Sequence, residues 1–148
     1  MTTKLVIRSP STDELETVRS VVQKVVDETY GGLWAPPPLI IDEGDWSRAQ
    51  VAVVSRRIVG VMLTQGEWIS DLWVLRESRG HGVGRRLLAF GESEISQRGF
   101  GTIRLRVVKS NASAVRFYVR NGWKAKREFK HEKLPIEMIE MTKSVGQS

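Results

Sequence analysis

The residues that decide the fold read Asp71-Leu-Trp-Val-Leu-Arg-Glu-Ser-Arg79-Gly-His-Gly82-Val-Gly84-Arg-Arg-Leu-Leu88. This stretch passes from a strand pattern through a turn and a glycine-rich loop into a helix pattern. Glycines at 80, 82 and 84 allow backbone conformations that a Cβ atom forbids. Several N–H groups can then converge at a helix start, where the helix dipole is positive. The loop therefore predicts a phosphate or pyrophosphate site, with cations at Arg79, Arg85 and Arg86.

Two other phosphate-binding motifs do not fit this spacing. The P-loop needs a Lys followed by Ser or Thr after its last glycine, and here Arg85 and Arg86 follow. The dinucleotide fingerprint needs glycine at its first, third and sixth positions. The sixth position is Arg85 when counted from Gly80, and Leu87 when counted from Gly82. Both motifs are therefore excluded.

Apolar periodicity on either side of the loop predicts alternating strands and helices. A capping box at Ser11 and Glu14 precedes a helix with an apolar face at Leu15, Val18, Val22 and Val25. A second helix runs from Gly84 to Ile95 and is ended by Gly99 and Gly101; a third carries Ala114, Phe117, Tyr118 and Asn121 and is closed by Gly122. Strands are expected at 4–8, 50–55, 58–64, 68–74, 102–108, 123–129 and 136–142.

The segment 31–45, with Trp34 and prolines at 36 to 38, predicts a loop with a short helix after it. This order of elements predicts one mixed α/β domain over 1–148. Its strand–helix–strand unit favours parallel pairing in the middle of the chain.

Composition excludes several classes of protein. The chain has no cysteine and two histidines, which rules out disulfides, thiolate metal sites and a cysteine nucleophile and argues against any metal site. The sequence shows neither a signal-peptide pattern nor a run of eighteen apolar residues, so we expect a soluble, cytoplasmic protein with no membrane segment. Its 23 Lys and Arg against 17 Asp and Glu are scattered, which does not favour nucleic-acid binding.

The stretch Arg79-Gly-His-Gly82-Val-Gly84 fits the pattern Arg/Gln-x-x-Gly-x-Gly. With Asp71-Leu-Trp-Val before it and Asn111-x-x-Ala-x-x-Phe-Tyr118-x-x-Asn-Gly-Trp123 after it, the sequence resembles the GCN5-related N-acetyltransferases (GNAT). The resemblance is strong over 68–123 and looser in the N-terminal half. It implies the GNAT fold, a central, mostly antiparallel twisted sheet with a splayed parallel strand pair and flanking helices.

The resemblance also implies acetyl-CoA as co-substrate and an amine as acceptor. The pyrophosphate would lie on the loop, and the pantetheine arm would pair with the backbone of Leu72, Trp73 and Val74. Asn111 matches a residue that contacts the cofactor arm, and it fits equally well as the cap of the next helix. The cofactor-binding residues of the loop would be Arg79, Gly80, His81, Gly82, Val83, Gly84 and Arg85.

Catalytic roles follow from the same resemblance. Tyr118 falls where the family keeps a tyrosine general acid, although a core aromatic residue is the alternative. Asp71 is the first candidate for a general base and Glu67 the second, and each could instead be a surface carboxylate. Relatives that acetylate the N-terminus of a ribosomal protein carry a glutamate base where this sequence has Arg106, and arginine cannot act as a base.

The acceptor is not specified by the sequence. Family members often line its pocket with the segment that holds Trp34 and 36–38 here, and Trp46, Trp68 and Trp73 could add aromatic walls or simply pack in the core. A non-catalytic CoA-binding or regulatory domain is the alternative function, and a nucleic-acid or protein-interaction module is a third. Many relatives form homodimers, and the sequence leaves the oligomeric state open.

Overall fold

The computed structural model describes residues 4–31 and 45–145. Its strands are β1 (Leu5–Arg8), β2 (Gln50–Val54), β3 (Arg57–Gln65), β4 (Trp68–Val74), β5 (Thr102–Val108), β6 (Lys124–Lys130) and β7 (Glu137–Ser144). The α-helices are α1 (Leu15–Tyr30), α2 (Val83–Gln97) and α3 (Ala112–Arg120), and short 3-10 turns are η1 (Thr12–Glu14), η2 (Trp46–Arg48) and η3 (Arg76–Ser78). The predicted elements are confirmed, with ends that differ by one or two residues.

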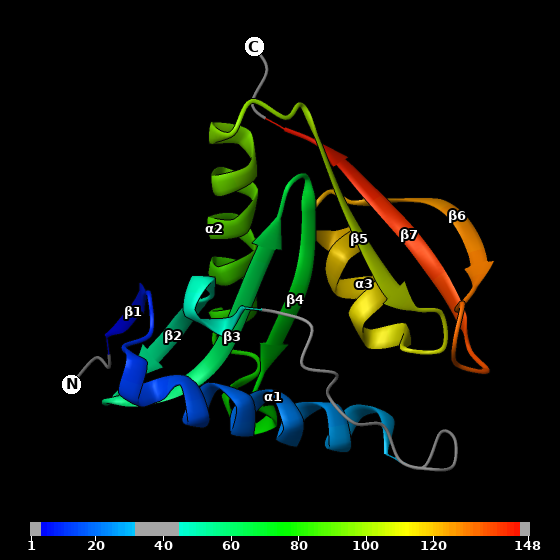
Figure 1. The fold of residues 1–148 in the computed structure, drawn as a ribbon. Coiled ribbons are helices and arrows are strands. Elements are labelled where there is room, and N and C mark those ends of the chain that lie inside the picture. The colour runs from blue at the N-terminus through cyan, green and yellow to red at the C-terminus, as the bar shows by residue number, and fades with distance from the viewer. Residues whose placement is uncertain (1–3, 32–44, 146–148) are drawn as a thin grey trace. The chain divides into compact units, whose positions relative to one another are not determined.

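The seven strands follow the order β1-β2-β3-β4-β5-β7-β6 (Figure 1). The printed registers are antiparallel between β1 and β2, β2 and β3, β5 and β7, and β6 and β7, while β4 and β5 are parallel. The predicted mixed α/β class is therefore confirmed. Contacts group the chain into two compact units, Met1–Leu63 with Asp71–Gly91 and Thr64–Ser70 with Glu92–Ser148. One domain over 1–148 stays a prediction.

In the first unit, α1 runs across β2, β3 and β4 near one end of these strands (Figure 1). Its buried valines 18, 21, 22, 25 and 26 form the predicted apolar face and pack with Val51, Val61 and Met62 in the core. Ser11 and Glu14 form the predicted capping box, in which a Glu14 carboxylate oxygen accepts the Ser11 amide at 2.9 Å. The core thus fixes α1 against the strands that lead to the glycine loop.

The turn between β2 and β3 departs from the usual hairpin sequence. Its two central residues, Ser55 and Arg56, have φ angles of 51° and 65°. Positive φ angles at both central residues are typical of a type I′ turn. Such a turn normally has Asn-Gly at these positions, because those residues tolerate positive φ. The chain therefore holds two strained non-glycine residues at this hairpin.

In the second unit, β5 alternates buried Ile103, Leu105 and Val107 with Arg104 and Arg106 on its other face. α3 ends at Arg120, and Gly122 has a φ of 92°, as predicted for a helix-terminating glycine. Trp123 follows and is buried, with its indole N–H donated to Glu92 at 3.1 Å.

Candidate functional site

The glycine loop connects η3 to α2. Gly80 and Gly82 have φ angles of 83° and 82°, so both need the freedom that only glycine has at low cost. Gly84 was expected to have a backbone conformation that a Cβ atom forbids, and this expectation was wrong. Gly84 lies inside the first turn of α2 and is not among the glycines with positive φ. A helical backbone conformation does not by itself require glycine, so within this loop the φ angles call for glycine at positions 80 and 82.

Backbone amides at the start of α2 are available to a ligand. The Arg86 amide donates to the Gly82 carbonyl at 3.0 Å, so the amides of Val83, Gly84 and Arg85 precede the first helical hydrogen bond. A Cβ atom built on Gly80 or on Gly82 would meet no atom within 4 Å. The backbone is therefore open beside orphan donors and a positive dipole end, an arrangement that fits a pyrophosphate.

The three arginines near the loop differ in their contacts. Arg79 donates through Nε to the Val74 carbonyl at 3.2 Å, which ties the loop to the end of β4. Arg86 donates to the Leu5 carbonyl at 3.4 Å and so points toward β1. Arg85 and His81 are exposed. Arg85 is thus the exposed cation of the first helical turn, whereas Arg86 is engaged by β1.

Gly60, a residue that the sequence analysis missed, sets how closely α2 approaches β3. A Cβ atom there would lie 2.8 Å from Leu87 Cδ1 and 3.3 Å from both Val83 Cγ1 and the Trp73 carbonyl oxygen. The start of α2 can therefore reach the strand only because residue 60 has no side chain. A lone glycine in an otherwise apolar strand is the signal that could have found it.

The strand before the loop carries the predicted pantetheine segment. The parallel register of β4 with β5 consists of one pair, Trp68 opposite Arg104, and the Arg104 amide donates to the Glu67 carbonyl at 3.0 Å. Leu72 to Val74 follow this pair along β4 and are half-buried.

Asp71 and Trp73 lie on the same face of β4. The Trp73 indole Nε1 donates to an Asp71 carboxylate oxygen at 2.9 Å. The Tyr30 ring, at the end of α1, meets the Trp73 ring edge-on with centroids 6.3 Å apart. Two predicted site residues, Asp71 and Trp73, are thus joined to each other, and Tyr30 of α1 packs against them. Trp34 and 36–38 lie outside the described residues.

The remaining tryptophans differ in their setting. Trp46 belongs to the hydrophobic core and is only 5% exposed, as the core-packing alternative predicts. Trp68 is half-buried at the start of β4.

Asn111 and Tyr118 lie at the two ends of α3. Asn111 is the N-cap, and its side-chain oxygen accepts the Ala114 amide at 3.3 Å, so the capping interpretation is confirmed. The half-buried Tyr118 ring meets Phe117 at 5.3 Å and Trp123 at 6.0 Å, both with T-shaped geometry. These aromatic contacts hold the ring from two sides.

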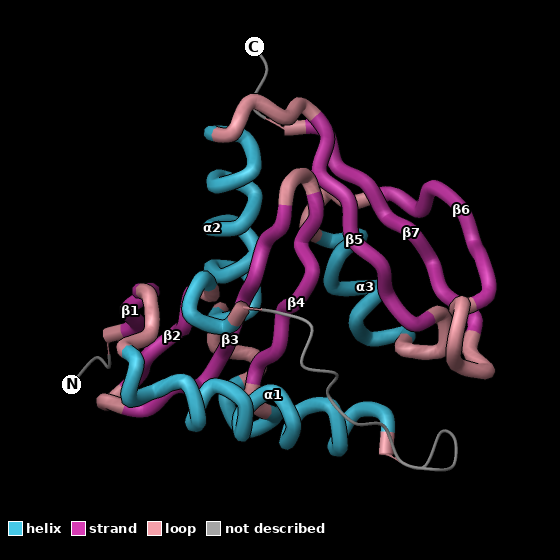
Figure 2. The backbone as a smooth tube through the Cα atoms, in the orientation of Figure 1, coloured by secondary structure: helices cyan, strands magenta, loops and turns pink. Residues whose placement is uncertain are grey.

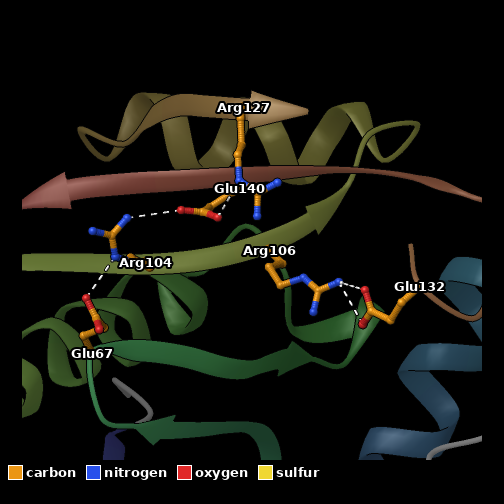
Figure 3. Close-up of polar contacts among 6 residues, drawn as sticks. All are labelled: Glu67, Arg104, Arg106, Arg127, Glu132 and Glu140. Carbon is orange, nitrogen blue, oxygen red and sulfur yellow. Dashed lines mark hydrogen bonds and ion pairs between the residues drawn. The ribbon is translucent and has the colours of Figure 1, made fainter. Parts of the chain in front are cut away.

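Glu67, the second candidate base, is held in a network of charges (Figure 3). Its carboxylate accepts Arg104 Nε at 2.9 Å, and Arg104 Nη1 donates to Glu140 at 3.1 Å. Arg127 Nε donates to the other oxygen of Glu140 at 3.1 Å. The hydrogen bond to Glu67 is the largest cause that raises the pKa of Arg104 above its ordinary value, so Arg104 keeps its positive charge beside Glu67. Glu67 is therefore less available as a base than the sequence suggested.

Arg106 is also engaged (Figure 3). It donates to both carboxylate oxygens of Glu132, at 3.2 and 2.9 Å, and its guanidinium lies 4.7 Å from the centre of the Phe129 ring. A cation, and no base, therefore stands at this position of β5.

A family model described as an acetyltransferase (GNAT) domain matches residues 43–145. The chain belongs to the GNAT acetyltransferase family. This membership confirms the resemblance drawn from the Arg79–Gly84 loop and the segments around it.

Solved structures of other proteins share the fold of this chain. The apo form of YjaB from Escherichia coli is 24% identical, with a TM-score of 0.74 and coverage of 97% of this chain and 99% of that one. The PaiA N-acetyltransferase of Thermoplasma acidophilum, solved with coenzyme A, is 19% identical and has a TM-score of 0.73. The match covers 96% of this chain and 99% of that one. YncA, a putative acetyltransferase of Salmonella typhimurium solved with acetyl-CoA, is 13% identical and has a TM-score of 0.77. The match covers 98% of this chain and 96% of that one.

A search of curated proteins returned no match. Within residues 4–31 and 45–145, no helix is long and apolar enough to cross a membrane. The same residues hold no cluster of three or more His, Cys, Asp or Glu side chains that could bind a metal ion.

Proposed function

We propose that this GNAT protein is a cytoplasmic enzyme that transfers the acetyl group of acetyl-CoA directly to a primary amine. The observation that carries the proposal is the open backbone at Gly80 and Gly82, beside the orphan amides at the start of α2. Family membership makes acetyl transfer the reaction that this anion site serves.

On the cofactor side, the amides of Val83, Gly84 and Arg85 hold the pyrophosphate, and the exposed Arg85 adds a positive charge. Backbone groups of Leu72, Trp73 and Val74 pair with the pantetheine arm. Arg79 holds the loop at the end of β4 through the Val74 carbonyl. Asn111 contributes chiefly as the cap of α3, and contact with the cofactor arm is its second role.

Acetyl-CoA supplies a thioester whose carbonyl carbon can accept an amine. Asp71 takes a proton from the ammonium form of the acceptor, directly or through a water molecule. As the nitrogen–carbon bond forms and the carbon–sulfur bond breaks, the Tyr118 hydroxyl gives a proton to the departing thiolate. The nitrogen then loses its second proton to the Tyr118 oxygen, directly or through water, which leaves a neutral amide and restores the phenol. A phenol, with an ordinary pKa of about 10, can act as this acid when it is well positioned. The chain has no cysteine to carry the acetyl group, which agrees with direct transfer.

Thermal unfolding with and without acetyl-CoA tests the cofactor site. Ligand at about a hundred times its Kd adds roughly 2.7 kcal/mol, which raises Tm by several degrees in a domain of this size. Gly82→Asp should abolish the shift, because it places a carboxylate in the phosphate site. Gly99→Asp is the matched control, since Gly99 also has positive φ (98°) and open space around its Cβ position.

Release of CoA in the presence of a panel of amines then tests the transfer. An acetyl-CoA shift that is lost only in Gly82→Asp, together with CoA release, supports the enzyme. A shift without turnover of any amine favours the non-catalytic CoA-binding alternative. No shift in the unmodified protein contradicts the proposal.

A further inference from the structure

A groove of about 370 Å³ lies between α1 and the β2–β3 turn, within the first unit. Figures 1 and 2 show the turn beside the N-terminal part of α1. The buried side chains of Val21, Ile58 and Leu75 form the apolar part of the groove lining. None of the residues assigned to acetyl-CoA or to catalysis lines it.

The groove carries uncompensated positive charge. Lys24, Arg56 and Arg57 line it, together with Glu14. Glu14 is already engaged, because Arg8 donates to both of its carboxylate oxygens at 2.8 and 3.0 Å.

A single carboxylate serves the other cations. Glu77 accepts Arg57 at 2.8 Å and lies 3.8 Å from Lys24 Nζ. Within the described part of the chain, Arg56 makes no hydrogen bond or ion pair. Two positive charges therefore remain in excess at the groove.

Backbone strain gives a second, independent observation at Arg56. Its φ of 65° is one that residues other than glycine and asparagine seldom adopt. Strained positions of this kind are concentrated at functional sites, where the surrounding structure holds them in place. The hairpin thus keeps a long cationic side chain where glycine would relieve the strain.

We propose that this groove is a second ligand site, which binds a small organic anion with a short apolar body. The Arg56 guanidinium, with Lys24 and Arg57, contacts the carboxylate or phosphate group. The apolar body lies on Val21, Ile58 and Leu75, while the Thr17 and Ser20 hydroxyl groups, which also line the groove, supply hydrogen bonds.

Thermal unfolding with benzoate, phenyl phosphate and benzyl alcohol tests the site. Benzoate or phenyl phosphate should raise Tm in a saturable way, and the stronger of the two identifies the preferred anionic group. Benzyl alcohol should give no shift, because it has the apolar body without the charge. Equal shifts with all three compounds, or no shift with either anion, would overturn the proposal.

Arg56→Gly and Ser55→Gly form a matched pair, because each places glycine at a positive φ in the same turn and only the first removes the cation. Arg56→Gly should weaken anion binding at least tenfold, and Ser55→Gly should preserve it. Both variants should keep the Tm shift with acetyl-CoA, which separates this site from the glycine loop. Equal anion affinity in the two variants, or loss of the acetyl-CoA shift in Arg56→Gly alone, would contradict a second site.

Discussion

The Trp73 indole nitrogen donates a hydrogen bond of 2.9 Å to the Asp71 carboxylate. The two residues are two positions apart on β4 and so share one face of the strand. Tyr30 of α1 packs edge-on against the same indole. The position of the carboxylate is therefore set by the packing of α1 as well as by its own strand.

Asp71→Asn should lower kcat by about a hundredfold or more, the usual contribution of a positioned general base. The acetyl-CoA shift in Tm should persist, because the side chain is not part of the cofactor site. Trp73→Phe retains the aromatic ring beside Tyr30 and removes the indole donor, so a smaller loss of kcat is expected. Steady-state kinetics over a range of pH measures both, and full turnover in Asp71→Asn would assign the carboxylate a structural role.

Tyr118→Phe should lower kcat markedly with acetyl-CoA affinity nearly intact. Phenylalanine preserves the ring contacts with Phe117 and Trp123, so a loss of rate reports on the hydroxyl group rather than on packing. Turnover kinetics and a Tm measurement on the same sample separate the two effects. Unchanged turnover would remove Tyr118 from the mechanism.

Gly60→Ala should destabilise the protein by about 1–2 kcal/mol, because the added methyl group meets Val83 and Leu87 of α2. It should also weaken acetyl-CoA binding, since Val83 begins the helix that carries the orphan amides. Gly101→Ala is the control, with no atom within 4 Å of its added Cβ. Urea unfolding and the ligand-induced Tm shift measure the two effects, and equal behaviour of both variants would show that the close approach is not needed.

Glu140→Ala should cost about 2 kcal/mol of unfolding free energy, because it leaves Arg104 and Arg127 without their shared, nearly buried carboxylate. Arg104 keeps Glu67, which limits the loss. Glu132→Ala removes a carboxylate that is 58% exposed, so its cost should be clearly smaller than that of Glu140→Ala. Urea unfolding compares the two variants, and similar costs would refute a special role for the network.

Part of the loss of folding stability at low pH should come from the protonation of Glu14. Hydrogen bonds from Arg8, and then from the Ser11 amide, lower the pKa of Glu14 from 4.5 to about 2. A carboxylate with a lower pKa in the folded state stabilises the protein above about pH 4.5, and this contribution is lost as the pH falls toward 2. Glu14→Gln should flatten the fall in stability over that window, whereas Glu16→Gln, at an exposed carboxylate of α1, should not. Thermal unfolding at several pH values provides the measurement.

Local patterns in the sequence were sufficient for the secondary structure and for the glycine loop. The spacing of Val18, Val22 and Val25 predicts the buried face of α1, and Gly122 predicts the end of α3. Such features depend on backbone conformation and on periodic burial, which act over a few neighbouring residues. For the same reason, Gly80 and Gly82 could be identified before any coordinates were available.

The tertiary structure decided what depends on residues far apart in the chain. The sequence offered Glu67 as a base or a surface carboxylate and showed Arg106 where some relatives carry a base. Neither pattern predicts that Arg104 binds Glu67 and that Arg106 binds Glu132, residues far away in the chain. The close approach of Leu87 to Gly60 has the same origin. The sequence by itself determined the family, the elements and the position of the glycine loop, because short-range sequence patterns encode them. Only the folded chain decided which charges are neutralised and which remain, because electrostatic pairing depends on distance in space rather than along the chain.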